Sequence, residues 1–143
     1  MIRGSCLCGG IRFEIEGSVT PIQICYAKRC QKTTGSGFAP ELAVRSDRFR
    51  WLEGEDLITR YDAPILREPP ALRRCFCRVC GSHVPVVREG ARFVVLMAGI
   101  LDDDPETRPF REIFTAQAPS WLPGGEELQR YEDRPPAEER LKL

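Results

Sequence analysis

Residues 76–82 read FCRVCGS, a short stretch that contains two of the seven cysteines of the chain. Cys77 and Cys80 are three positions apart, and Gly81 follows at once. In a turn with this spacing the backbone amides point at two sulfur atoms that share one ion, and glycine tolerates the positive φ that the turn requires. The turn therefore predicts one half of a zinc site, and the other half must come from elsewhere in the chain.

A second pair of cysteines supplies the missing half. Residues 4–10 read GSCLCGG and place Cys6 and Cys8 directly before the first expected strand. Four thiolates at about 2.3 Å form a closed tetrahedral shell with no position for a substrate, so we expect a structural zinc. The alternative is four buried free cysteines that behave as small apolar residues. Four arginines near these cysteines in the sequence are candidates to offset the charge of a zinc tetrathiolate, and the alternative is that they are simply solvated: Arg3, Arg12, Arg74 and Arg78.

The charge, the apolar runs and the cysteine count of the chain argue against some classes of function. The 143 residues carry 21 Lys plus Arg and 21 Asp plus Glu, so no net charge favours nucleic acid or a membrane surface. No apolar run approaches the length of about 18 residues that predicts a membrane span, and MIRGSCLCGG has no secretory apolar segment, so we expect a cytoplasmic protein. Seven cysteines in a reducing compartment indicate metal binding or catalysis rather than a disulfide framework.

The apolar pattern predicts a mainly β fold of short antiparallel strands. Period-two alternation and Gly/Pro punctuation mark nine strands, at residues 11–15, 22–25, 38–44, 49–52, 57–61, 72–76, 83–87, 92–97 and 112–116. Residues 28–34 predict the one helical turn. We expect a single domain over residues 1–130, followed by a polar, Pro-rich tail at 131–143.

Five stretches together resemble one known family. GSCLCGGIRFEIEG, QKTTGSGF, RCFCRVCGSHV, MAGILDDDPETRP and EIFTAQAPSW follow one another between residues 4 and 121. In this order they are similar to the glutathione-dependent formaldehyde-activating enzymes, whose relatives include centromere protein V. The resemblance implies a β-tent fold with a structural zinc on the two cysteine pairs described above.

The same resemblance implies a catalytic zinc, and here the chain departs from the family. Members show a CxCxxC cluster, whereas residues 24–32 read ICYAKRCQK. Cys25 and Cys30 match the outer thiols, and Ala27 stands in place of the middle one. Glu112 stands where many members have a histidine. A catalytic zinc needs about three protein ligands and one open position, so the cluster is degenerate as it stands.

Candidates for the missing ligand are Cys75, which we expect on the same side of its strand as Cys77, and His83, the only histidine. The sequence also leaves open that Cys75 is a buried thiol, that His83 is structural, and that Cys25 and Cys30 form a redox pair.

The resemblance implies carbon-sulfur lyase-like chemistry on glutathione adducts of small aldehydes, with Cys25 and Cys30 catalytic. The alternative is a non-catalytic, zinc-structured module that binds a small molecule or a protein, so the sequence leaves enzymatic activity open. Glutathione is expected near Cys25, Cys30 and Trp121. Three basic side chains stand beside the thiols to attract its carboxylates: Lys28, Arg29 and Lys32.

Overall fold

The computed structural model describes residues 1–64, 72–122, 128 and 131–132, and these ranges contain ten strands and one α-helix. The strands are β1 (Ile2–Ser5), β2 (Arg12–Ile15), β3 (Ile22–Cys25), β4 (Ala39–Arg45), β5 (Phe49–Glu53), β6 (Ile58–Asp62), β7 (Arg73–Cys77), β8 (His83–Val84), β9 (Phe93–Met97) and β10 (Pro109–Ile113). The helix α1 (Lys28–Thr34) follows β3. The 3-10 turns are η1 (Ser46–Arg48), η2 (Glu55–Leu57), η3 (Ala98–Ile100) and η4 (Thr115–Gln117).

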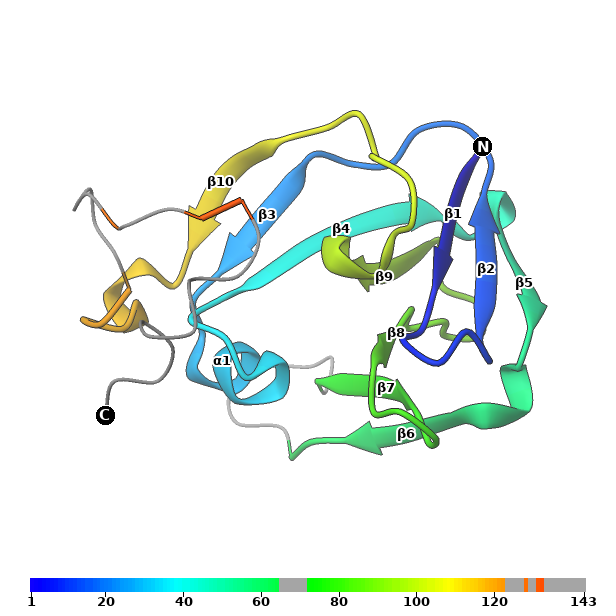
Figure 1. Cartoon of the computed structure of the whole chain (residues 1–143), viewed down its shortest axis with the longest axis horizontal. Helices are drawn as coiled ribbons and strands as arrows, with labels where there is room; N and C mark the ends of the chain where they lie inside the picture. Colours follow the sequence, from blue (N-terminus) through cyan, green and yellow to red (C-terminus); the bar gives the residue numbers. More distant parts are fainter. Residues whose placement is uncertain (65–71, 123–127, 129–130, 133–143) are drawn as a thin grey trace.

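The strands form three small sheets, in the orders β1-β2-β5, β10-β3-β4-β9 and β6-β7-β8. Figure 1 shows the first sheet at the right, the four-stranded sheet across the top and the third sheet below. The mainly β fold expected from the sequence is confirmed. One pairing differs from the expected antiparallel arrangement, because β10 lies parallel to β3.

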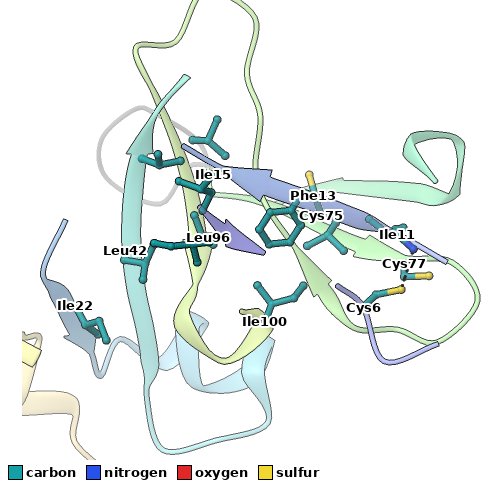
Figure 2. Close-up of a cluster of buried hydrophobic side chains, with 14 residues drawn as sticks. Cys6, Ile11, Phe13, Ile15, Ile22, Leu42, Cys75, Cys77, Leu96 and Ile100 are labelled. Carbon is teal, nitrogen blue, oxygen red and sulfur yellow. Dashed lines mark hydrogen bonds between the residues drawn. The ribbon is translucent and has the colours of Figure 1, made fainter. Parts of the chain in front are cut away.

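The main core lies on one face of the four-stranded sheet. Leu42 of β4 and Leu96 of β9 pack there with Phe13 and Ile15 of β2 (Figure 2). The core requires a glycine at position 4, because a side-chain carbon on Gly4 would lie 2.1 Å from the Phe13 ring. Figure 2 places Cys6 and Cys77 at one end of this cluster, so the first predicted metal site borders the core.

A second, smaller cluster lies on the opposite face of the same sheet. Strand side chains alternate between faces, so Leu42 and Val44 enter the core while Ala39 and Glu41 point the other way. There Ala39 packs with Cys25 of β3 and Cys30 of α1. One sheet thus separates the main core from the thiols of Cys25 and Cys30, and α1 covers the thiol side.

Most predicted elements lie within one or two residues of the observed ones, and α1 and β3 have the predicted bounds. The strand predicted at 83–87 is shorter and covers only His83–Val84. The predicted strand 112–116 is wrong. The strand is Pro109–Ile113, and it ends because Phe114 adopts a left-handed φ of 54° that interrupts extended backbone. Strand β1 was not predicted, because four residues that include a central glycine give little period-two signal.

The predicted tail at residues 131–143 lies almost wholly outside the described residues, so the domain boundary stays a prediction. Among the described residues, no helix combines the length and the apolar character needed to cross a membrane.

Candidate metal centres

The first centre joins the turn after β1 to the turn between β7 and β8. The sulfur atoms of its four cysteines all lie within 4.8 Å of one another: Cys6, Cys8, Cys77 and Cys80. The Sγ atoms of Cys6 and Cys8 are 3.5 Å apart, and those of Cys8 and Cys77 are 3.9 Å apart. Bonds of about 2.3 Å in a tetrahedron separate sulfur atoms by about 3.8 Å. The donor set therefore fits zinc.

A hydrogen-bonded glycine with positive φ closes each turn, as the sequence predicts for Gly81. The amide of Gly9 donates to the carbonyl of Cys6, and the amide of Gly81 donates to the carbonyl of Cys77, each at 2.8 Å. Both glycines have a φ of 74°, which a residue with a side chain would rarely adopt. The amide of Leu7 donates to the hydroxyl of Ser82 at 3.0 Å and ties the two turns together.

The thiols of this centre differ in acidity. The side chain and the amide of Ser82 hydrogen-bond Cys80 and lower the pKa of its thiol to about 5. The Gly10 amide lowers the pKa of Cys8, but the neighbouring thiols and burial outweigh it and raise this pKa to about 11. A bound cation would take the place of protons that these sulfurs otherwise share.

The second centre forms where α1 folds back over β3 and β4. Cys25 ends β3, the chain turns at Ala27, and Cys30 lies one helical turn later above Cys25. Their Sγ atoms are 3.4 Å apart and both side chains are buried. The structure thus brings together the two thiols that the sequence proposed as catalytic.

The third member of this centre is Glu41, which the sequence did not predict. Its Oε1 lies 3.8 Å from Sγ of Cys30, and the three potential ligand atoms lie within 4.8 Å of one another. The pairing of β3 with β4 brings Glu41 close to the thiols, because the pairs Gln23↔Glu41 and Cys25↔Ala39 follow each other on the same face of the sheet. A glutamate between Pro40 and Leu42 in an otherwise apolar strand was the available signal.

A buried arginine completes the surroundings of Cys30. Arg74 of β7 is 8% exposed, its Nη2 donates to Sγ of Cys30 at 3.4 Å, and its Nε has no hydrogen-bond partner among the described residues. Burial, assisted by Cys25 and Glu41, raises the pKa of Cys30 to about 12, and Arg74 opposes this rise. The prediction that Arg74 serves the four-cysteine centre is wrong, because its side chain contacts the second centre instead.

Neither candidate for the missing ligand joins the second centre in the structure. Cys75 is buried in the main core with Cys77, which agrees with the alternative of a buried thiol, and burial raises its pKa. Nε2 of His83 lies 2.7 Å from the carbonyl oxygen of Thr33. Of the two, His83 contacts α1 through the backbone, and Cys75 lies among the core side chains.

The basic side chains beside the thiols are partly engaged elsewhere. Nζ of Lys28 donates to Gln31, and Nη2 of Arg29 donates to the carbonyl of Pro64. Lys32 is exposed. Trp121 is 67% exposed and lies against Gly37.

A groove of about 380 Å³ opens on the same sheet face as Glu41. Gln23, Glu41 and Val95 line its floor, and Phe110 and Arg111 of β10 line one side. The Arg111 guanidinium stacks over the Phe110 ring at 4.7 Å, and its Nε donates to Oε1 of Gln23 at 2.6 Å. A chain of polar contacts therefore connects the groove with the thiol pair through Gln23 and Glu41.

Comparison with known proteins identifies a family model and similar solved structures. A family model described as "Glutathione-dependent formaldehyde-activating enzyme" matches residues 1–117. The crystal structure of a Rhodobacter sphaeroides protein, determined as a Northeast Structural Genomics target, is similar with a TM-score of 0.54. The two chains are 20% identical, and the match covers 76% of this chain and 99% of that chain, so it bears on the fold alone. No curated protein is significantly similar to the chain.

Proposed function

The chain belongs to the glutathione-dependent formaldehyde-activating enzyme family, and from this premise we propose that it is a two-metal protein with carbon-sulfur lyase-like activity. The reaction joins a small thiol such as glutathione to a small aldehyde, or separates them. In the forward direction the thiol sulfur bonds to the carbonyl carbon, the π bond of the carbonyl breaks, and the thiol proton ends on the new hydroxyl group. In the reverse direction the same carbon-sulfur bond breaks.

We assign the four-cysteine centre a structural role. Four thiolates close the coordination shell of zinc, so no position is open to a substrate. This centre also links a turn near the N-terminus to a turn some seventy residues later, and it borders the main core. Its contribution to function is to hold β7 and β8 in place.

The observation that carries the proposal for the second centre is the position of Glu41, 3.8 Å from Sγ of Cys30. Two thiolates and one carboxylate supply the three protein ligands that catalytic zinc sites have. Zinc bound there would supply an open position for a thiol sulfur or a carbonyl oxygen. A carboxylate from β4 would thus replace the middle thiol of the family's cluster, where this chain has Ala27.

The groove beside Glu41 is the proposed binding place of the thiol compound. Its volume of about 380 Å³ falls within the usual range of small-ligand sites, which is roughly 300–1,000 Å³. Glutathione carries two carboxylates, and Arg111 offers a guanidinium at the side of the groove. The Phe110 ring and Val95 provide apolar contact for the rest of the ligand.

A count of zinc ions tests this proposal. We expect two zinc ions per chain in the wild type and one in Glu41→Gln. The control is Glu89→Gln, which changes an exposed glutamate in the connection between β8 and β9 and should keep two zinc ions. NMR exchange spectroscopy measures the rate at which glutathione and formaldehyde form their adduct. This rate should increase with the wild type and the control but not with Glu41→Gln.

The alternative function is a zinc-structured binding module without turnover. A wild type that holds one zinc ion, with no acceleration of adduct exchange at saturating zinc, would establish this alternative and refute the lyase proposal.

A further inference from the structure

Two of the side chains that contact helix α1 come from the strands on either side of the FCRVCGS turn. Arg74 lies three residues before Cys77, and His83 lies three residues after Cys80. Both reach α1, which carries Cys30 of the second centre. Figure 1 shows α1 next to β7, and the third sheet continues from there to the four-cysteine turn.

The contact of Arg74 is the more deeply buried one. Arg74 as a whole is 8% exposed, and among the described residues the bond from its Nη2 to Sγ of Cys30 is the one hydrogen bond of its side chain. A buried guanidinium is costly unless an electron-rich partner receives its hydrogen bonds. The position of Cys30 therefore matters for the burial of Arg74, and Arg74 in turn favours one position of the Cys30 sulfur.

The contact of His83 is made to the end of the helix. The carbonyl of Thr33 accepts at 2.7 Å, so Nε2 of His83 carries the proton and donates it. The last carbonyls of a helix have no partner within the helix, and Thr33 lies in the last turn of α1. His83, from the sheet β6-β7-β8, thus supplies a hydrogen-bond donor to this carbonyl and fixes the end of a helix that has only seven residues.

The geometry of β7 explains how one strand serves both centres. Cys75 and Cys77 face the main core, whereas Arg74 projects from the other face toward α1. On β8, Val84 faces the core and His83 faces α1. The strands that the four-cysteine turn joins therefore present one face to the core and the other face to the helix.

We propose that Arg74 and His83 are positioning residues that fasten α1 to the strands of the four-cysteine turn and so set the place of Cys30 opposite Cys25 and Glu41. The geometry of the second centre therefore depends on the first centre, because the first centre holds β7 and β8 in place. The part of this inference that concerns a second metal rests on the proposed function, but the fastening of α1 does not.

Hydrogen exchange of residues 28–34 tests the fastening, in protein loaded with one equivalent of zinc. We expect Arg74→Met and His83→Ala to raise the exchange rate of α1 amides and the alkylation rate of Cys30 by about tenfold each, the effect of losing a hydrogen bond worth about 1.4 kcal/mol. His83→Gln, which keeps an N–H donor, and Arg74→Lys, which keeps a cation, should recover part of the protection. Arg73→Met is the matched control, since Arg73 lies on the same strand and pairs with Asp62 instead.

The same variants are then compared in a Glu41→Gln background, where we expect no second metal. If hydrogen exchange of the α1 amides still becomes faster in these variants, Arg74 and His83 hold the helix whether or not a second metal binds. His83 is only partly buried, so His83→Ala is expected to fold, and retention of the first zinc and a cooperative melting curve check this. Unchanged exchange and alkylation in both Arg74→Met and His83→Ala would overturn the proposal.

A spectroscopic measurement separates positioning from general stability. Cobalt added after the first centre is filled with zinc should give a thiolate-to-cobalt band in the wild type. We expect a weaker and shifted band in His83→Ala, a recovered band in His83→Gln, and an unchanged band in Arg73→Met. An identical band in wild type and His83→Ala counts against a positioning role.

Discussion

Gln23 and Glu41 lie opposite each other on β3 and β4, and Nε2 of Gln23 donates to Oε2 of Glu41 at 3.3 Å. Arg111 donates to the other end of the same amide, at 2.6 Å, which fixes which end of Gln23 carries the nitrogen. With Oε2 engaged, Oε1 is the oxygen that faces Cys30. Gln23 therefore aims the carboxylate at the thiol pair.

Removal of this amide should weaken the second centre. We expect Gln23→Met, which keeps the size of the side chain, to lower zinc affinity at the second centre by about 10- to 100-fold, as is usual when a group that orients a metal ligand is lost. Competition with a chromogenic chelator measures it, and the zinc of the four-cysteine centre is the internal control. An affinity equal to that of the wild type would show that Glu41 needs no such support.

Loss of a ligand from the four-cysteine centre should unfold much of the domain. Cys8 is the most informative position, because its side chain is exposed and Cys8→Ala leaves no cavity in the core. Zinc binding in small domains is worth about 10–16 kcal/mol at neutral pH, which is comparable with the whole stability of a domain at about 5–15 kcal/mol. Thermal melting and zinc content measure the effect, with Leu7→Ala, at an 87% exposed neighbour, as the control. A Cys8→Ala protein that keeps both its zinc and its melting temperature would refute the structural role.

Cys75 should behave as a core residue and not as a ligand. We expect Cys75→Ala to leave the number of zinc ions unchanged and to lower the free energy of unfolding by about 1 kcal/mol, because a small buried side chain is shortened. Cys75→Ser should cost more, about 1–3 kcal/mol, if its hydroxyl finds no partner. Urea unfolding and metal analysis check both variants. Loss of one zinc ion in Cys75→Ala would instead identify Cys75 as a ligand.

The pair of Arg3 and Asp103 should resist mild acid. Hydrogen bonds from the side chain and the amide of Arg3 lower the pKa of Asp103 to about 2, against about 3.9 for an ordinary aspartate. A lowered pKa in the folded state gives a stabilisation that is complete above about pH 4 and is lost between pH 4 and pH 2. The difference in melting temperature between wild type and Asp103→Asn should therefore stay constant from pH 7 to about pH 4. A difference that closes between pH 7 and pH 5 would contradict this assignment.

The first centre could be predicted from the sequence because each half lies within one tight turn, where spacing alone fixes the geometry. The second centre could be predicted only in part. Glu41 reaches Cys30 through the register of two strands, and short apolar strands do not reveal their register in the sequence. The sequence does not show that Arg74 contacts the second centre, because nearness to Cys77 along the chain says nothing of the face from which a strand side chain projects.

The alternation along β4 has a consequence for how the chain folds. A slip of β4 by one residue against β3 would turn Leu42 toward α1 and push the carboxylate of Glu41 into the main core. Burial of an ionised carboxylate without partners costs several kcal/mol, so such misaligned pairings are unstable as soon as the core closes. Glu41 thus also selects the register of β4 during folding, because its carboxylate is stable only in the alignment that brings it to the second centre.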